Sequence, residues 1–269
     1  MQNYKLSLSY DGTDFYGWQR QPDKRTIQGV LEESLTKITR KKIHVVGAGR
    51  TDAGVHAQEQ AANFKANLSL KDEELFRALN SLLPDEVRVN SLKKIDVDFH
   101  ARKMAKSKIY QYRIFNSPII SPFLQRYSLQ WSSPLKVNLM KEAAPLFARE
   151  ADFQPFSSNR LLNSVRKVMR SEIEKKGDEI IYTVEAKGFL RYMVRTMAGT
   201  LLEIGKGKMP PEKIEEIFRE KKRSLAGPTI PAKGLCLLKV NYELIAHGGF
   251  KKNKNGIILH FPRFNIRWA

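Results

Sequence analysis

Cysteine is almost absent: Cys236 is the only one in 269 residues. A single thiol excludes both an intrachain disulfide and a zinc site built from a cysteine cluster. It also suits a reducing compartment, so we expect a cytoplasmic protein. The chain contains no apolar run of about eighteen residues, the minimum expected of a transmembrane helix, and its first ten residues lack the apolar centre of a secretory signal.

Acidic residues are also scarce, with 28 Asp and Glu against 47 Lys and Arg, which gives a formal net charge of +19. Two stretches contain no acid at all, Phe99–Lys141 and Ala246–Ala269. Either stretch alone suits an ordinary solvated surface. Together with the overall excess they favour a polyanionic partner, of which nucleic acid is the commonest.

Complete cofactor and metal motifs are missing. The string Gly47-Ala48-Gly49 starts like the dinucleotide-binding pattern G-x-G-x-x-G, but its sixth position is Asp52 and no good helix follows. Asp52 and His56 form one potential metal pair without a further ligand nearby. We therefore expect neither a metal nor a small-molecule cofactor. A tight turn built around Asp52 is the purely structural alternative.

Strand and helix patterns alternate along the chain. Residues 4–10, 109–115, 180–186 and 235–242 show strand patterns, and a helical stripe over 27–38 follows Thr26, a suitable N-cap. A longer helix is predicted from about 190 to 204. This order predicts an α+β protein of two similar α/β halves, residues 1–104 and 105–245, with mixed, antiparallel-rich sheets. A basic extension, 246–269, follows them.

One glycine-rich segment gathers Arg50, Thr51, Asp52 and His56 within a few residues. With five other motifs in the same order, it resembles the tRNA pseudouridine synthase A family over nearly the whole chain. The carrying segments are Tyr10–Gln19, Gly49–Ala57, Asp98–Arg102, Tyr110–Tyr112, Phe189–Arg195 and Ala226–Leu235.

The resemblance implies that Asp52 is the catalytic aspartate of an isomerisation. That reaction breaks the bond between uracil N1 and ribose C1′ and rejoins the base through C5. A carboxylate suits it as a base or as a nucleophile, and the sequence leaves both roles open. The resemblance also implies that Arg195 pairs with Asp52 and that Tyr110 meets the target base. Arg50, two residues before Asp52, is placed either to occupy the space that a flipped base vacates or to hold the flipped nucleotide.

Simpler roles exist for several of these side chains. Arg195 also suits an exposed helix surface, because Arg191, four residues earlier, is expected on the same helical face. Tyr112 suits ordinary sheet packing. We expect His56 to be structural or RNA-facing, not catalytic.

The resemblance further implies a pseudouridine synthase fold whose halves meet at a basic catalytic cleft. It implies a homodimer that binds one tRNA and modifies uridines at positions 38 to 40 of the anticodon stem-loop. One alternative is a related synthase acting on another RNA. A second is a non-catalytic RNA-binding protein, against which the joint presence of Arg50, Asp52, Tyr110 and Arg195 argues. A third, a metal-dependent nuclease, needs clustered carboxylates that the sequence lacks.

Overall fold

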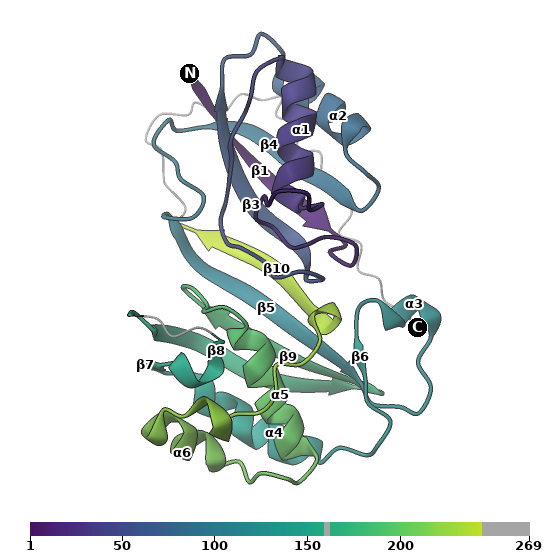
Figure 1. The fold of residues 1–269 in the computed structure, drawn as a ribbon, viewed down its shortest axis with the longest axis vertical. Helices are drawn as coiled ribbons and strands as arrows, with labels where there is room; N and C mark the ends of the chain where they lie inside the picture. The colour runs from purple at the N-terminus through teal and green to yellow at the C-terminus, as the bar shows by residue number, and fades with distance from the viewer. Residues whose placement is uncertain (159–161, 244–269) are drawn as a thin grey trace, which may run out of the picture.

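The computed structural model describes residues 1–158 and 162–243 (Figure 1). The predicted basic extension, 246–269, lies outside the described residues. The first half of the chain forms β1 (Gln2–Tyr10), α1 (Ile27–Thr39), β2 (Val45–Gly47), β3 (His56–Ala66), α2 (Asp72–Leu82) and β4 (Val87–Ile95). The rest forms β5 (Ala105–Phe115), α3 (Pro122–Gln125), β6 (Leu129–Gln130), α4 (Val137–Ala143), β7 (Glu150–Asp152), β8 (Val165–Lys176), β9 (Glu179–Ala186), α5 (Met193–Gly205), α6 (Lys213–Glu220) and β10 (Leu235–Tyr242).

A single sheet runs through both halves in the order β4-β1-β3-β10-β5-β9-β8-β7, with β2 added on β3 and β6 on β5. Among the described strands, only β10 with β3 and β5 with β6 pair in parallel, so the prediction of a mixed, antiparallel-rich α+β fold is confirmed. The strand β10, from the end of the described chain, lies between β3 and β5 and joins the two halves (Figure 1). The division into domains at residue 104 stays a prediction.

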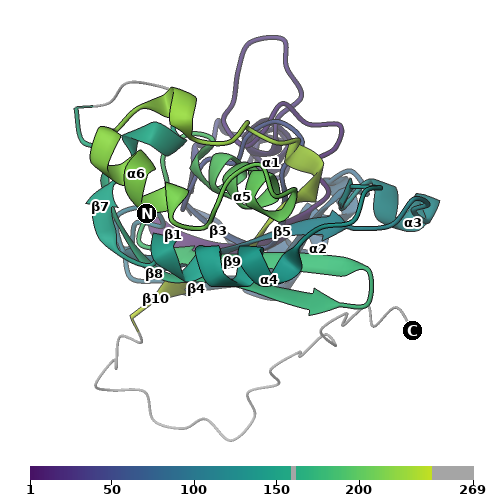
Figure 2. The same ribbon diagram turned by 90° about the horizontal axis from the view of Figure 1, so that it is seen from below.

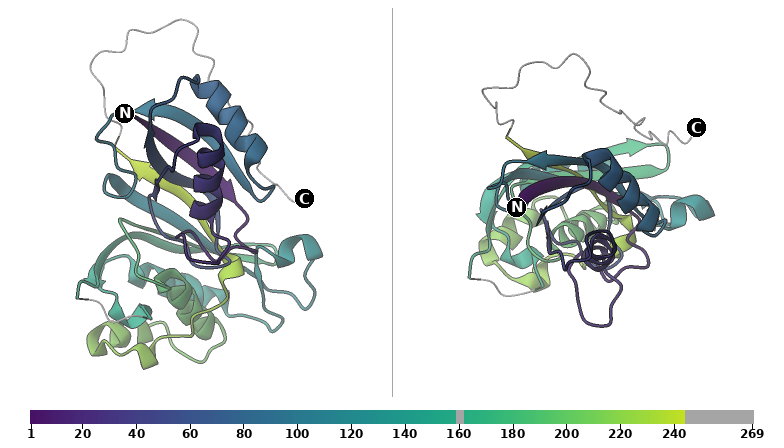
Figure 3. Two further views of the ribbon diagram at one scale, coloured as in Figure 1. Left: turned by 45° about the horizontal axis from the view of Figure 1, so that its top comes forward. Right: turned by 90° about the horizontal axis from the view of Figure 1, so that it is seen from above.

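The helices cover the sheet unevenly. Helices α1, α5 and α6 lie on the same side of it (Figure 2). Figure 3 shows α1 over the N-terminal strands and α5 with α6 at the opposite end of the sheet. The core lies between these helices and the strands, and it takes the alternate residues of β1, namely Tyr4, Leu6, Leu8 and Tyr10. Within the described residues, no helix has the length and apolar character needed to cross a membrane.

The start of α1 matches the sequence-based prediction, whereas the start of α5 does not. The Thr26 hydroxyl accepts a hydrogen bond from the Gly29 N–H at 3.2 Å, which confirms the predicted cap of α1. The prediction of a helix from residue 190 is wrong at its start, because Tyr192 is left-handed with a φ of 63° and α5 begins at Met193. Arg191 therefore lies in a turn and does not share a helical face with Arg195.

Candidate active site

Asp52 lies on a loop between β2 and β3, residues 48–55, here called the Asp52 loop. The backbone carbonyl of Thr51 accepts from the Trp18 N–H at 3.0 Å, and the Thr51 hydroxyl is 3.0 Å from the Tyr10 hydroxyl. On the other side of Asp52, the Gly54 N–H donates to the Phe15 carbonyl at 3.2 Å. The segment that follows β1 thus holds the Asp52 loop on both sides of the carboxylate.

Two glycines allow that segment to come so close. Gly17 has a φ of +82°, and a Cβ there would lie 2.5 Å from the Thr51 carbonyl oxygen. A Cβ on Gly12 would lie 2.0 Å from the carbonyl oxygen of Val55. Both distances are shorter than any real contact, so a side chain at either position would displace the Asp52 loop. Both glycines lie in the sequence motifs, but the residues they approach are distant in the chain, and local sequence patterns do not predict such contacts.

Strand β10 brings the Asp52 loop beside β5. Cys236 is in parallel register with His56, the first residue of β3 after the loop. The next residue, Leu237, is in antiparallel register with Tyr110 on β5. The two predicted site segments, far apart in sequence, therefore meet through one intervening strand.

Arg195 projects from the first turn of α5 toward Asp52. Its Nη1 lies 3.6 Å from Asp52 Oδ2, and its Nε donates to the Ile230 carbonyl at 2.7 Å. The side chains of Arg195 and Asp52 are 15% and 26% exposed, so this pair is shielded from bulk water. The carbonyl contact orients the guanidinium, which in turn restricts the carboxylate.

Opposing influences act on the Asp52 carboxyl. Burial is the largest and raises its pKa, whereas the charges of Arg195 and Arg191 lower it. The net result is a pKa above the ordinary aspartate value. Arg191 makes no ion pair within the described chain, and its guanidinium carbon lies 4.8 Å from the ring centroid of Tyr192. It therefore acts on Asp52 through its field, not through a direct contact.

Tyr110 is 6% exposed on β5 and packs edge-to-face on Phe189, with ring centroids 5.2 Å apart. Burial raises the pKa of its hydroxyl far above the ordinary value, so the group stays protonated. Among the described residues, no hydrogen-bond partner reaches this hydroxyl, which leaves it available to a ligand. Tyr112, by contrast, is fully buried and donates to the Pro231 carbonyl at 2.7 Å, as expected for sheet packing.

A cleft of about 1040 Å³ contains all four predicted site residues, Asp52, Arg50, Tyr110 and Arg195. Only Asp52 and Glu150 are acidic among its lining residues, and Arg195 is the only lining cation in an ion pair within the described part of the chain. The eight basic lining residues are Arg50, Arg102, Lys108, Arg166, Lys167, Lys187, Arg191 and Arg195. Among the described residues, seven lining cations without an ion pair outnumber two lining carboxylates, which makes the cleft a site for a large anion.

Comparison with known proteins identifies the family of this chain. A family model described as tRNA pseudouridine synthase matches residues 7–102 and 143–243. The chain belongs to this family. The tRNA pseudouridine synthase A of Thermodesulfovibrio yellowstonii is 42% identical over 254 residues, covering 90% of this chain and 100% of the relative. That of Thermoanaerobacter sp. strain X514 is 41% identical over 244 residues, with the same two coverages.

Solved structures give a more distant likeness. The archaeal box H/ACA sRNP Nop10-Cbf5 complex matches with 13% sequence identity and a TM-score of 0.28, covering 74% of this chain and 52% of that one. So remote a similarity adds nothing about function.

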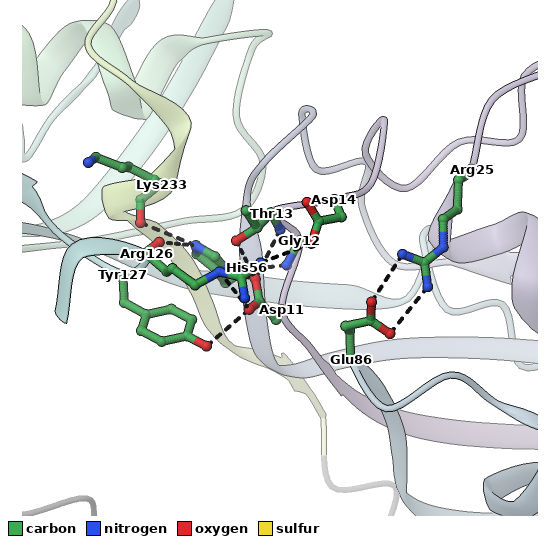
Figure 4. A network of polar contacts seen from close by, with 10 residues as sticks. All are labelled: Asp11, Gly12, Thr13, Asp14, Arg25, His56, Glu86, Arg126, Tyr127 and Lys233. Atoms are coloured by element: carbon green, nitrogen blue, oxygen red, sulfur yellow. Dashed lines mark hydrogen bonds and ion pairs between the residues drawn. The ribbon is translucent and has the colours of Figure 1, made fainter. Parts of the chain in front are cut away.

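His56 of this synthase is a structural link next to the Asp52 loop (Figure 4). Its Nδ1 accepts from the Gly12 N–H at 3.1 Å and lies 3.1 Å from Asp11 Oδ1. Its Nε2 lies 3.1 Å from the Arg126 carbonyl and 3.2 Å from that of Lys233, so this nitrogen carries a proton. One ring thus connects three segments around the site, which agrees with the structural role expected of it.

Asp11 completes this link. It accepts a hydrogen bond from the Tyr127 hydroxyl at 3.0 Å, in addition to its contact with His56. Burial raises the pKa of Asp11, but the neighbouring His56 and the hydrogen bonds from the backbone N–H and hydroxyl of Thr13 more than offset it and hold that pKa well below the usual range. Among the residues that the structure describes, no group of three or more His, Cys, Asp or Glu is arranged to hold a metal.

We expect Asp11→Asn to destabilise the protein at neutral pH by about 1–3 kcal/mol, because it leaves its donors with a weaker acceptor. A carboxyl with a lowered folded-state pKa stabilises above its unfolded pKa, and that contribution is lost as pH falls through the folded value. The melting-temperature difference from wild type should therefore shrink below about pH 4. Asp85→Asn, which removes a fully exposed carboxylate, is the control. An equal loss in both variants would contradict the role of Asp11.

Proposed function

We propose that this protein converts uridine to pseudouridine in tRNA, with Asp52 as the catalytic carboxylate. The observation that carries the proposal is the position of Asp52: it is the partly buried partner of Arg195 inside a cleft lined by unpaired cations. Membership of the tRNA pseudouridine synthase family and the names of the relatives support the same reaction and substrate.

The reaction exchanges one bond of the nucleotide for another. The N1–C1′ bond breaks, a C5–C1′ bond forms, C5 loses a proton and N1 gains one, so no electrons are exchanged with a cofactor. Asp52 acts either as a nucleophile or as a base. Its raised pKa increases its proton affinity, and Arg195 keeps it charged and aimed.

Tyr110 and Arg50 bind the target nucleotide. Tyr110 presents a ring and a free hydroxyl to the cleft, which suits contact with an uracil that has left its stack. Arg50 is exposed at the cleft and pairs with no carboxylate in the described chain. It either fills the space that the flipped base vacates or holds the flipped nucleotide, which lowers the energy needed for flipping.

The unpaired cations predict a steep salt dependence of tRNA binding. Each phosphate contact contributes a slope of about −0.7 to −0.9 to log affinity against log salt, and several contacts add. Filter binding or fluorescence titration of tRNA between low and physiological salt measures the slope. A slope no steeper than that of one contact would contradict RNA binding through this cleft.

The proposed targets are uridines at positions 38 to 40 of the anticodon stem-loop. The test is to map pseudouridine in total RNA of a strain lacking this protein, and in tRNA transcripts incubated with the purified chain. Loss of the modification at these positions alone supports the proposal. Loss at other sites points to the related synthase with another RNA target, and tRNA binding without any pseudouridine points to the non-catalytic alternative.

We further propose a cytoplasmic homodimer that holds one tRNA across both subunits, as the family resemblance implies. Analytical ultracentrifugation of the full chain, with and without tRNA, tests the oligomeric state. A particle with the mass of one chain at working concentration would oppose it.

A further inference from the structure

Lys108 is a nearly buried cation in the cleft with no counter-ion. It lies on β5, is 8% exposed, and forms no ion pair with any described residue. Its Nζ has one long hydrogen bond, 3.4 Å to the Lys187 carbonyl, although an ammonium has three donors. Burying a charge with so few partners is costly, and an anion beside Lys108 would offset that cost.

Neighbouring residues hold Lys108 against the Asp52 loop and add to its positive charge. A Cβ on Gly49 would lie 3.1 Å from Lys108 Cε, so the absence of a side chain there leaves room for the lysine stem. Burial first, and the charge of Arg102 second, lower the pKa of Lys108. Arg102 and Lys187 line the same cleft and make no ion pair within the described chain. An anion placed among the three would relieve their mutual repulsion.

We propose that Arg102, Lys108 and Lys187 form a phosphate-binding subsite for the RNA backbone beside the target nucleotide. Lys108 and Tyr110 are alternate residues of β5, so they project to the same side about 6.6 Å apart. A nucleotide whose base contacts Tyr110 brings an adjacent phosphate to Lys108. The phosphate oxygens accept from the ammonium, whose compact charge suits this deep position. The subsite rests on the proposed function in taking RNA as the ligand and in placing the target base against Tyr110.

Binding is measured without turnover, in an Asp52→Asn background, with an anticodon stem-loop RNA over a series of salt concentrations. Lys108→Met retains the length of the side chain and removes its charge. We expect roughly tenfold to hundredfold weaker binding at low salt and a log–log slope shallower by about 0.7–0.9. Lys108→Arg should restore the slope, and Lys239→Met, on an exposed lysine of β10, should leave it unchanged.

The phosphate itself is located with stem-loops that carry one neutral methylphosphonate at each linkage flanking the target uridine. At one linkage the neutral group should weaken binding by the parent protein and leave the Lys108→Met variant without further loss. Arg102→Met changes an exposed side chain, so it should fold and shift the slope in the same direction even if Lys108→Met melts early.

The subsite is overturned if Lys108→Met and Arg102→Met bind with the parent affinity and slope. It is also overturned if Lys108→Met in the active enzyme loses turnover while the slope is unchanged, since Lys108 would then serve the chemistry alone. These outcomes are separate from the proposed function. If the protein makes pseudouridine but the substitutions leave RNA affinity and its salt slope unchanged, the subsite is refuted. If the substitutions weaken binding as expected but the protein makes no pseudouridine, only the proposed reaction is refuted.

Discussion

Asp52→Asn should lower pseudouridine formation by roughly three orders of magnitude or more, while tRNA affinity stays within a few fold. The amide is nearly isosteric with the carboxylate, so the Asp52 loop keeps its contacts with Trp18 and Phe15. The change removes the nucleophile or base and nothing else near the substrate. Binding persists because it depends mainly on Lys and Arg contacts with phosphates, which the substitution leaves in place.

Single-turnover kinetics on an anticodon stem-loop, with affinity measured in parallel, separate these two effects. Asp98→Asn is the matched control, because it removes an exposed carboxylate from another family motif outside the cleft. Thermal melts accompany both variants, since Asp52→Asn leaves Arg195 without its counter-charge. Easily measured turnover by Asp52→Asn would refute the assignment of the catalytic residue.

Local patterns predicted the parts of this fold that local forces decide. The strand predicted at 235–242 is β10, Leu235–Tyr242, because its strand pattern is visible in the sequence. The cap of α1 likewise requires only Thr26 and a residue three positions on. Each of these features depends on neighbours within a few residues.

Features that depend on distant partners were not predictable in this way. The position of β10 between β3 and β5 follows from pairing between residues far apart in the sequence. The periodicity of a single strand does not predict which strands it pairs with. Lys108 resembled any solvated lysine of the acid-free stretch, yet the sheet and Gly49 enclose it. The Asp52–Arg195 contact came from family resemblance, because nothing local distinguishes Arg195 from a surface arginine.

Arg195→Ala should reduce turnover by roughly 10–100-fold, and Arg191→Ala by only a few fold. The difference lies in contact: Arg195 reaches Asp52 at 3.6 Å and is itself anchored on the Ile230 carbonyl. Arg191 is exposed, packs on Tyr192 and influences Asp52 only through its field. Without Arg195 the carboxylate loses both its nearest positive charge and the group that restricts its rotation.

The pH dependence gives this prediction a distinct signature. Because both arginines lower the Asp52 pKa against burial, removing Arg195 should raise that pKa further. A reaction that needs the carboxylate then loses rate as pH falls, starting at a higher pH than in wild type. Arg195→Lys should reverse most of this rise in the Asp52 pKa by returning the positive charge. It should recover less of the maximal rate, because lysine lacks the Nε that donates to the Ile230 carbonyl. The test is to measure turnover across pH for Arg195→Ala, Arg195→Lys and Arg191→Ala, with thermal melts as controls for stability. Near-normal turnover by Arg195→Ala, together with loss of turnover in Arg191→Ala, would contradict the assignment of Arg195 as the functional partner of Asp52.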